Sequence, residues 1–543
     1  MYLGNFIKNL DKRYQKIFFS GVAFNSLKVK KDNIFFAIKG TKFDGNDYIP
    51  LAIKNGSKII ITERKLNKFH NGILFIHTNN IRKLLAEICF KILKKKPNNL
   101  IAVTGTNGKS SVAEFFYQIL SLINNKVASI GTLGVKSKNF NLNLSNTTID
   151  PIQLSEILYK LKNKKTEHVI MDASSHGLKQ KRLDGLLFNS GIFTNLSQDH
   201  LDYHKNLNNY LNAKLYLFKN LIKKNGNLIT DKNIPEFKKI KKIATDKKLK
   251  LFTINDKKNK FHILSHTFQG ETQILKIKFN DNIENVNLNL IGKIQLKNVL
   301  MAITAAIQSK IDIKKILKVI PRLKSVEGRF EKIGKLKNKS KVILDYAHTP
   351  QALKTCLSNL KEQFPNKKII LLFGCGGNRD QNKRAKMGKI AQDFSDKIYL
   401  TDDNPRFENS NKIRRDIKRG INKKIFTEIP NRAEAILKAV KNLNSGEILL
   451  IAGKGHEKTQ NLGKKIIFFS DKKIILKAIK IKNLNLYKNL KLNLITELSN
   501  NKRLLINSTF NQARINSKEV KKNDVFFAIK GIKNDGNKYL KEA

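Results

Sequence analysis

Residues 100–114, LIAVTGTNGKSSVAE, have the residue types and spacing of a phosphate-binding loop. An apolar stretch predicts a short strand, a turn with Gly105 and Gly108 follows, and Lys109 opens a segment with helical periodicity. Glycines let backbone N–H groups approach phosphate oxygens, and a helix N-terminus adds positive potential. Lys109 can reach the β- and γ-phosphates, and the Ser110 hydroxyl can bind Mg²⁺. The spacing G-x-x-G-K-S is shorter than the general pattern, so the alternative is a glycine turn with a solvated lysine.

The elements expected around this loop place further polar residues beside it. The helix after the loop has four apolar side chains spaced for one buried face: Val112, Phe115, Phe116 and Ile119. Two more predicted strands, residues 168–171 and 190–195, lead into Asp172 and His200. Strands that alternate with helices predict a mostly parallel sheet, which binds ligands at the carboxyl ends of its strands. A carboxylate and an imidazole there suit Mg²⁺ and phosphate chemistry, although each alone is typical of an ordinary loop.

A second set of strand-end loops lies between residues 325 and 480. Four apolar runs predict strands at residues 341–344, 369–373, 397–400 and 447–451. The polar loops after them are rich in Gly, Arg, Asp and His, and they span residues 345–350, 374–380, 402–406 and 453–457. Because an open parallel sheet builds its site where such loops meet, this segment predicts a second ligand-binding edge.

The two ends of the chain share one sequence pattern. Residues 1–97 alternate short apolar runs with helical stretches, which predicts a small α/β domain for ligand binding. Residues 516–543 repeat residues 25–52 without gaps, with 17 of 28 positions identical. This internal repeat predicts a partial second copy of the N-terminal domain. The copy has no phosphate loop of its own, so we expect no second enzymatic activity from it.

The composition favours a cytoplasmic protein of several domains. A chain of 543 residues is long enough for three or four domains. Its three cysteines, Cys89, Cys356 and Cys375, form no C-x-x-C pair, which argues against a disulfide framework or a zinc site. The N-terminus lacks the pattern of a signal peptide, and no apolar run approaches the roughly 20 residues of a membrane span.

The formal net charge of +62 raises the question of a nucleic-acid partner. The lysines are spread along the whole chain, Trp is absent, and aromatic residues do not alternate with basic ones as in base-stacking surfaces. We therefore expect no nucleic-acid partner and no membrane insertion. The positive field instead favours acidic, phosphorylated substrates.

Eight motifs, taken in chain order, carry a family resemblance. They are TGTNGKSS, NTT, SSHGLKQKR, TNLSQDHLDYH, DYAHTP, GCGGNRD, DDNPR and GKGHE. In this order they resemble the Mur ligases, the ATP-dependent amide ligases of peptidoglycan precursor synthesis, over about residues 20–480. The resemblance implies an α/β architecture of three domains: a UDP-substrate-binding domain (1–97), a central P-loop-type ATP-binding domain with a mostly parallel sheet (98–322), and a Rossmann-like amino-acid-binding domain (323–482). Residues 490–543 resemble the start of a second Mur ligase.

The same resemblance implies a reaction, in which meso-diaminopimelate is joined to UDP-MurNAc-L-Ala-D-Glu. The γ-phosphoryl group of ATP would convert the D-glutamyl side-chain carboxylate into an acyl phosphate, which the amine then attacks. The implied cofactors are ATP, Mg²⁺ and a carbamylated lysine, and the enzyme is expected to be a monomer. The alternatives are an L-lysine-adding Mur ligase and a folylpolyglutamate-synthase-like ligase. Asn404-Pro405-Arg406 and the full N-terminal domain argue against both.

The resemblance also assigns residues to each ligand. For ATP they are Gly105, Thr106, Asn107, Gly108, Lys109, Ser110, Ser111, Asn298, Arg329, Asp345 and His348. For the UDP-substrate they are Phe24, Ser26, Thr41, Asn146, Thr147, Thr148, Ser174, Gln180 and Arg182. For diaminopimelate they are Arg379, Asp403, Asn404, Pro405, Arg406, Gly453 and Glu457. The implied metal ligands are Ser110, Asp172, His200 and carbamylated Lys214, and the implied catalytic residues are Lys109, His200 and Lys214.

Arg406 has a physical reason for its assignment, because a guanidinium can pair bidentately with the carboxylate that lysine lacks. Two departures from the usual family pattern bear on function. Asp172 replaces the commoner Glu and shortens a metal ligand by one methylene. Asn25-Ser26-Leu27 replaces Asp-Ser-Arg, which changes the contacts expected with the uracil ring.

Overall fold

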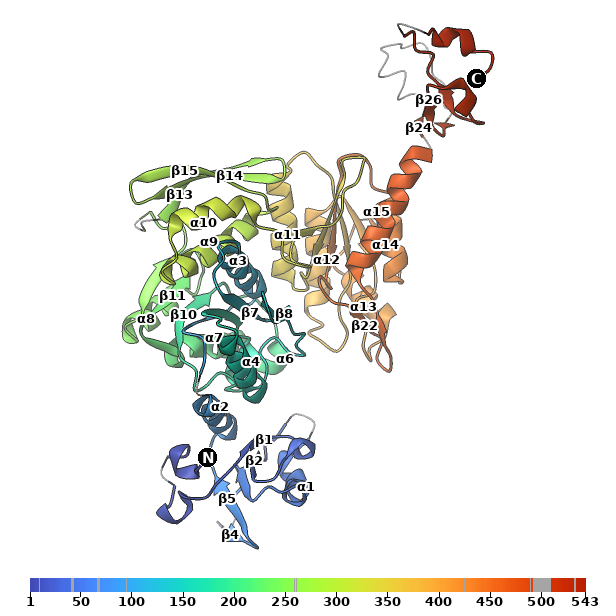
Figure 1. Ribbon diagram of the computed structural model, residues 1–543. Helices are drawn as coiled ribbons and strands as arrows, with labels where there is room; N and C mark the ends of the chain where they lie inside the picture. The colour runs from blue at the N-terminus through green and yellow to red at the C-terminus, as the bar shows by residue number, and fades with distance from the viewer. Residues whose placement is uncertain are drawn as a thin grey trace. The chain divides into compact units, whose positions relative to one another are not determined.

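Figure 1 shows the computed structural model of the chain. It describes residues 1–8, 10–40, 43–65, 69–93, 95–257, 259, 261–423, 425–488, 490–491, 509–531 and 534–543. The chain divides into two compact units, Met1–Val326 and Glu327–Ala543. Among the helices within these described ranges, none combines the length and the apolar character needed to cross a membrane.

A five-stranded sheet forms the start of the first unit. Its order is β1-β2-β3-β5-β4, with bounds Gly21–Ala23, Asn33–Phe36, Ile59–Thr62, Ile73–His77 and Phe69–His70. All pairs are parallel except β4 with β5. Two helices accompany these strands, α1 (Ile49–Lys54) and α2 (Ile81–Ile92). The alternation of strands and helices predicted for this region is confirmed.

A seven-stranded sheet forms the centre of the first unit, in the order β12-β11-β10-β6-β9-β7-β8. The bounds in that order are Lys250–Thr253, Ile222–Thr230, Phe188–Phe193, Asn99–Thr104, His168–Asp172, Val127–Gly131 and Gly134–Ser137. All neighbours are parallel except β7 with β8. Strand β6 lies between β10 and β9. The loops after these three strands therefore meet at one edge of the sheet, as the predicted mostly parallel sheet requires.

Strand β6 contributes to two cores because its side chains alternate between the faces of the sheet. Ile101 and Val103 join one buried cluster, while Leu100 and Ala102 join the other. The first cluster includes residues of α3 (Lys109–Leu122), α9 (Lys293–Gln308) and α10 (Ile313–Val319). The second includes residues of α4 (Pro151–Asn163), α7 (Leu207–Asn220) and α8 (Phe237–Asp246). Helices thus cover both faces and exclude water from the central strands.

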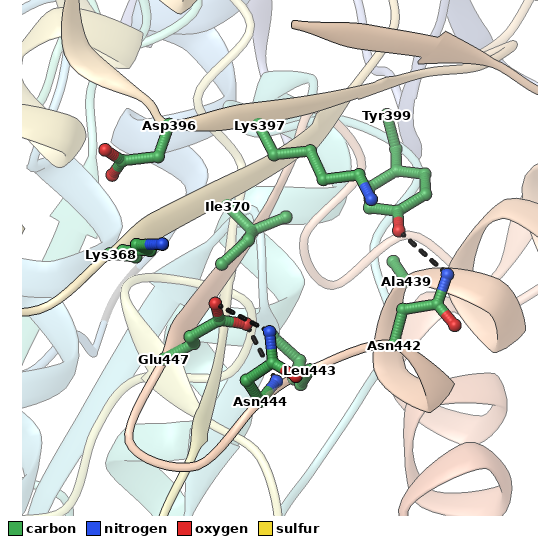
Figure 2. Close-up of a pocket in the computed structure, with 10 residues that line it drawn as sticks. All are labelled: Lys368, Ile370, Asp396, Lys397, Tyr399, Ala439, Asn442, Leu443, Asn444 and Glu447. Carbon is green, nitrogen blue, oxygen red and sulfur yellow. Dashed lines mark hydrogen bonds between the residues drawn. The ribbon is translucent and has the colours of Figure 1, made fainter.

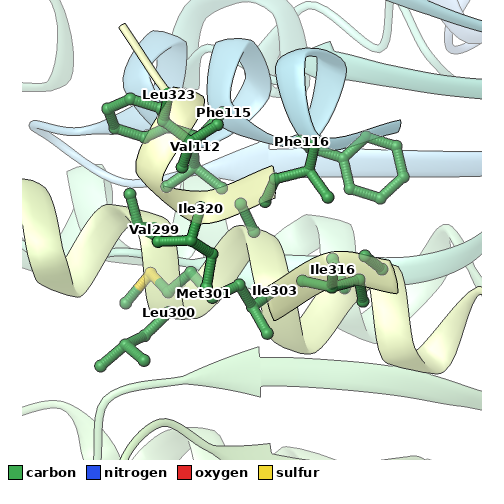
Figure 3. Packing of buried hydrophobic residues seen from close by; sticks show 14 of the residues in the cluster. Val112, Phe115, Phe116, Val299, Leu300, Met301, Ile303, Ile316, Ile320 and Leu323 are labelled. Carbon is green, nitrogen blue, oxygen red and sulfur yellow. The ribbon is translucent and has the colours of Figure 1, made fainter. Parts of the chain in front are cut away.

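The predicted apolar face of α3 is confirmed. Its four side chains, Val112, Phe115, Phe116 and Ile119, are fully buried. Figure 3 shows three of them in one packed group with side chains of α9 and of the segment that follows it. This packing holds α3, and with it the phosphate loop at its N-terminus, in a fixed position.

A three-stranded antiparallel sheet, which the sequence reading did not predict, also belongs to the first unit. It runs β13-β14-β15, with bounds Phe261–Gln269, Thr272–Phe279 and Asn282–Leu288. Leu275 and Ile277 on one face of β14 are buried in the same cluster as α3. Leu275, Ile277 and Phe279 recur at every second position of β14 and are buried, and this recurrence is the period-two signal that could have predicted the strand.

The second unit contains a six-stranded sheet in the order β16-β17-β21-β18-β19-β20. The bounds in that order are Glu331–Lys332, Lys341–Asp345, Ile448–Ala452, Ile369–Phe373, Lys397–Leu400 and Phe426–Glu428. The helices are α11 (Pro350–Gln363), α12 (Lys383–Phe394), α13 (Ser410–Lys418), α14 (Arg432–Lys441) and α15 (Asp471–Lys488). The four predicted strands of this unit are β17, β18, β19 and β21. They are parallel to one another, so their loops share the carboxyl edge.

Figure 2 shows a pocket of about 350 Å³ in the second unit. Three of the residues that line it, Lys368, Asp396 and Glu447, directly precede β18, β19 and β21. The pocket therefore lies at the amino ends of these strands, opposite the predicted ligand-binding edge. The Asp396 carboxylate accepts a hydrogen bond from the backbone N–H of Ile369 at 2.8 Å. The Glu447 carboxylate accepts one from the backbone N–H of Asn444, also at 2.8 Å.

The repeat at the end of the chain has the same local structure as its counterpart. Strands β26 (Ala513–Arg514) and β27 (Val525–Phe526) are parallel, with Ala513 opposite Val525. In the N-terminal domain, Val22 lies opposite Ile34, at the corresponding positions of the repeat. The second copy therefore has the strand register of the first.

Candidate active site

The phosphate loop has a backbone shape that only glycine can supply at two positions. Gly105 has φ 146° and Gly108 has φ 86°, and Gly108 is the N-cap of α3. A Cβ on Gly105 would lie 1.9 Å from the Thr194 hydroxyl oxygen, and a Cβ on Gly108 would lie 2.7 Å from Asn298 Oδ1. These close approaches hold the loop against Thr194 and Asn298, and the N–H groups of Thr106 and Asn107 donate to the carbonyl and side-chain oxygens of Asn195, at 2.9 and 3.0 Å.

Two lysines approach the same carbonyl of this loop. Lys109 Nζ donates to the carbonyl oxygens of Gly105 (2.9 Å) and Thr106 (2.8 Å). Lys214 Nζ, from α7, donates to the Gly105 carbonyl at 2.6 Å. Lys214 is 1% exposed, and burial together with the charge of Lys109 holds its pKa well below the usual value for lysine. The structure therefore places Lys214 at the loop and favours its neutral amine.

Asp172 ends β9 beside the first turn of α3. Its Oδ2 accepts hydrogen bonds from the Ser110 hydroxyl (2.8 Å) and from the backbone N–H of Thr132 (3.3 Å). A carboxylate and a hydroxyl are oxygen ligands of the kind Mg²⁺ prefers, so the pair fits that ion. Within the described ranges, no group of three or more His, Cys, Asp or Glu side chains is gathered closely enough to hold a metal.

His200, the other predicted metal ligand of the sheet edge, lies at the start of α6 (Leu201–His204) with φ 54°. Its Nε2 is 3.4 Å from Asp199 Oδ2, and its ring meets the His176 ring edge-on with centroids 4.8 Å apart. His200 therefore belongs to a cluster of imidazole and phenol rings that also contains His204 and Tyr210.

His204 gives this cluster a pH dependence. Its ring is buried, with Nε2 3.0 Å from the Ser175 hydroxyl, and burial lowers its pKa from 6.5 to about 4. The unfolded chain then binds the proton first, so stability is complete above pH 6.5 and falls as the pH drops toward 4. We expect the free energy of unfolding to fall by up to about 3 kcal/mol across that window. Urea unfolding at several pH values should show a flatter profile for His204→Gln, and an equal slope would contradict the assignment.

The residues predicted for the UDP-substrate form a hydrogen-bonded group in the first unit. Thr148 Oγ1 donates to the Asp172 carbonyl (2.8 Å) and accepts from the Ser174 N–H (2.9 Å). Arg182 donates to the Thr148 carbonyl and, through Nη2, to Gln180 Oε1 at 2.7 Å. The group is thus linked to Asp172, and through it to the phosphate loop.

The remaining predicted substrate residues differ in their surroundings. Thr147 Oγ1 is 3.0 Å from Thr132 Oγ1, and Asn146 is exposed. In the N-terminal domain Phe24 is 40% exposed, whereas Ser26 is 5% exposed and therefore presents little surface to a ligand. Thr41 lies outside the described residues.

The predicted ATP residues divide between the two units. In the first, buried Asn298 of α9 lies against Gly108. In the second, the Arg329 guanidinium stacks 4.2 Å from the Tyr346 ring centroid, and His348 Nδ1 is 2.9 Å from the Tyr346 carbonyl oxygen. Asp345 accepts the Phe330 and Ala347 N–H groups, each at 2.7 Å, while its burial raises the pKa of the carboxyl.

The predicted diaminopimelate residues come together at the carboxyl edge of the second sheet. Arg406, with φ 54°, donates from Nη1 to the Gly377 carbonyl at 2.8 Å. Burial and the neighbouring charge of Arg379 lower the pKa of Arg406. Asn404 Nδ2 donates to Glu457 Oε2 at 2.9 Å. The polar loops that the strand pattern placed at one edge are therefore in contact.

Gly453 and Asp403 also lie close together at this edge. Gly453 has φ 117°, and a Cβ there would lie 2.5 Å from Asp403 Oδ2. The Pro405 carbonyl oxygen would lie 1.9 Å from a Cβ on Gly377. Both glycines are thus required by the close approach of neighbouring loops.

Several residues of these sites were missed by the sequence reading. Thr194 Oγ1 and Asn195 Nδ2 donate to the Asn107 carbonyl, at 2.6 and 3.2 Å, and so hold the phosphate loop. They directly follow β10, so the rule that ligands gather at strand ends could have found them. Lys454 is fully buried and donates to Asn404 Oδ1 (3.0 Å) and Glu457 Oε2 (2.9 Å). A lysine between glycines gives no signal of such burial.

Comparison with known domain families gives three matches along the chain. Residues 19–91 match the Mur ligase family catalytic domain. Residues 103–306 match the Mur ligase middle domain, and residues 328–455 match the Mur ligase glutamate ligase domain. These matches cover the N-terminal sheet, the seven-stranded sheet and the sheet of the second unit.

The chain is also similar to individual proteins over most of its length. The UDP-N-acetylmuramoyl-L-alanyl-D-glutamate–2,6-diaminopimelate ligase of Rickettsia conorii is 39% identical over 480 residues, covering 87% of this chain and 98% of that protein. The ligase of the same name from Buchnera aphidicola is 38% identical over 488 residues, covering 86% and 96%. A solved structure of a ligase of that name has 28% identity and a TM-score of 0.65, covering 89% of this chain and 99% of its own. The MurF ligase of Thermotoga maritima in complex with ADP, at 18% identity and TM-score 0.55, covers 85% of this chain and 96% of its own and shares the fold.

Proposed function

This chain belongs to the Mur ligase family, and on that premise we propose that it joins meso-2,6-diaminopimelate to UDP-N-acetylmuramoyl-L-alanyl-D-glutamate at the expense of ATP. Relatives that carry the name of this reaction match 87% of the chain. The observation that carries the choice of amino acid is the pair of guanidiniums, Arg379 and Arg406, at the carboxyl edge of the second sheet. They supply the charge that a second carboxylate on the incoming amino acid needs.

The reaction requires activation because a carboxylate oxygen is a poor leaving group. Transfer of the γ-phosphoryl group of ATP to the D-glutamyl carboxylate would give an acyl phosphate and ADP. Attack by the amine of diaminopimelate then forms the amide, and phosphate leaves with the former carboxylate oxygen. Such transfers depend on positioning and on neutralisation of charge.

The chain's own groups suit the first of these steps. The N-terminus of α3 would bind the phosphate oxygens, and Lys109 would neutralise charge on the β- and γ-phosphates. Mg²⁺, held by Ser110 and Asp172, would supply further positive charge to the same oxygens. His200 would contribute to the metal site from the adjoining loop.

We propose in addition that Lys214 is carbamylated and holds a second Mg²⁺. Its neutral amine would add to CO₂, forming a carbamate and releasing one proton. The lowered pKa of the buried Lys214 supports this step, since only the neutral amine is a nucleophile. The change would convert an amine whose nitrogen lies 2.6 Å from the Gly105 carbonyl oxygen into a carbamate, whose carboxylate is the chemistry a metal site needs.

ADP release from purified protein tests the reaction and its specificity together. With UDP-MurNAc-L-Ala-D-Glu and Mg²⁺, we expect release with meso-diaminopimelate to exceed release with L-lysine by at least about a hundredfold, because a site built for a carboxylate is left with unpaired charge by lysine. Comparable ADP release with L-lysine would support the ligase activity and reject the preference for diaminopimelate. No release with either amino acid would reject the proposed function.

Two further proposals concern the state of the enzyme. We propose that it acts as a monomer in the cytoplasm, where its nucleotide substrates are made. Light scattering at assay concentrations and cell fractionation test these points. A stable dimer or a membrane-bound pool would contradict them.

A further inference from the structure

A buried arginine joins the two loops that carry Arg379 and Arg406. Arg384, on α12, has a fully buried side chain, and its Nη1 and Nη2 donate to the two carboxylate oxygens of Glu408 at 2.6 and 2.7 Å. Nη1 also donates to Asp416 Oδ2 on α13 at 3.0 Å. Glu408 lies two residues after Arg406, so the bidentate pair attaches the Arg406 loop to α12.

Glu408 also binds the other loop. Its Oε2 accepts the backbone N–H of Asn378 at 3.0 Å, directly before Arg379. The Phe407 N–H donates back to Asn378 Oδ1 at 3.0 Å. One carboxylate thus connects the residue that precedes Arg379 with the segment that follows Arg406.

The two loops that Glu408 connects carry two positive side chains, Arg379 and Arg406. Burial and the neighbouring charge of Arg379 lower the pKa of Arg406, so part of the shift is repulsion between the two guanidiniums. Arg406 also has a left-handed backbone, φ 54°, which is unfavourable for a side chain without outside support. Arg406 also reaches the loop that carries Arg379, because its Nη1 donates to the Gly377 carbonyl at 2.8 Å.

We propose that the Arg384–Glu408 pair is a positioning device that fixes the separation of Arg379 and Arg406 and thereby selects the acceptor amino acid. The proposal rests on the proposed function, in which these arginines bind diaminopimelate. If the separation of the two guanidiniums is fixed, the site binds an amino acid only when the distance from its reacting amine to its distal carboxylate matches that separation. Neither Arg384 nor Glu408 needs to touch the substrate.

Glu408→Gln is the sharpest test, because it removes the ion pair and keeps the size of the side chain. Arg384 retains Asp416 as a counter-charge, so the second unit is expected to fold. We expect the KM for diaminopimelate to rise by about tenfold to a hundredfold, since small displacements of binding groups have effects of that size. The KM for ATP should stay unchanged, and the preference for diaminopimelate over L-lysine should fall. Arg384→Lys, which keeps the charge without the bidentate geometry, should give an intermediate loss.

Glu428→Gln is the matched control. Glu428 Oε1 accepts from the buried Arg414 at 2.7 Å in the same unit, and its other partner is Lys418. Removing this carboxylate therefore weakens a comparable ion pair that does not connect one loop to the other, and Arg414 keeps Asp402, at the start of the Arg406 loop, as a counter-charge. We expect a similar change in thermal stability from both substitutions, and a change in the KM for diaminopimelate from Glu408→Gln alone.

Arg406→Lys, measured in parallel, separates the two proposals. If Arg406→Lys raises the KM for diaminopimelate and Glu408→Gln does not, the positioning role is rejected and the proposed function stands. If Arg406→Lys leaves that KM unchanged, the placement of diaminopimelate itself is rejected. Equal shifts in Glu428→Gln and Glu408→Gln would show a general structural effect and would also overturn the positioning role.

Discussion

Lys109→Met is expected to lower kcat for ADP release by about a thousandfold or more. The ammonium group lies at the phosphate loop, 2.9 Å from the Gly105 carbonyl, where it can follow the negative charge that moves with the γ-phosphoryl group. Fixed charge of this kind usually contributes more to the transition state than to ground-state binding. We therefore expect the affinity for ATP, measured by titration calorimetry, to weaken much less than kcat. The fold should be unaffected, because Lys109 is only half-buried.

Lys160→Met provides the control for this result. Lys160 lies on α4 in the same unit and is exposed. The substitution removes the same charge from the protein as a whole, so any effect of net charge on ATP binding should be shared. A loss of kcat in Lys160→Met, or full activity in Lys109→Met, would contradict the role of Lys109.

Lys214→Met should be the second inactive variant, with kcat lowered by about a hundredfold or more, because it removes the group proposed to become a metal-binding carboxylate. The free energy of unfolding should change little, because Met replaces the buried lysine side chain by an apolar one of similar length. The native enzyme should lose activity in CO₂-depleted buffer and regain it with bicarbonate. With ¹³C-bicarbonate, the native enzyme should show a carbamate carbon signal that Lys214→Met lacks.

Lys219→Met is the matched control for Lys214→Met, because Lys219 lies on the same helix, α7, and is exposed. It should retain activity and the response to bicarbonate. An unchanged native activity after CO₂ removal, together with no carbamate signal, would reject the carbamate. Loss of kcat in Lys214→Met would then have to come from the packing around Gly105.

The parts of the fold that could be predicted from sequence are those specified by local patterns. The apolar run before Gly105 is the central strand β6, and the helical spacing of Val112 and Phe116 gives the buried face of α3. The predicted parallel sheet placed Asp172 near the phosphate loop, and in the structure Asp172 accepts a hydrogen bond from Ser110. Such predictions succeed because period and strand direction depend on a few neighbouring residues.

The parts that could not be predicted depend on distant partners. Arg384 and Lys454 were given no role from the sequence, yet both are fully buried, because each meets acceptors that lie tens of residues away along the chain. The placement of Lys214 at Gly105 likewise joins residues more than a hundred positions apart. The resemblance to a family, and not the residues themselves, gave Lys214 a role. Sequence patterns carry little information about such pairs.

The paired strands at the two ends of the chain differ in what surrounds them. Strands β1 and β2 belong to a five-stranded sheet, whereas β26 and β27 form a sheet of two strands with the same register. In both copies an asparagine caps the short helix between the strands, Asn25 through Leu27 N–H and Asn516 through Lys518 N–H. The alignment of the pair is therefore encoded within about twenty consecutive residues. Such a segment can be duplicated within a gene, and the copy can pair its two strands without contacts from the protein that surrounds it.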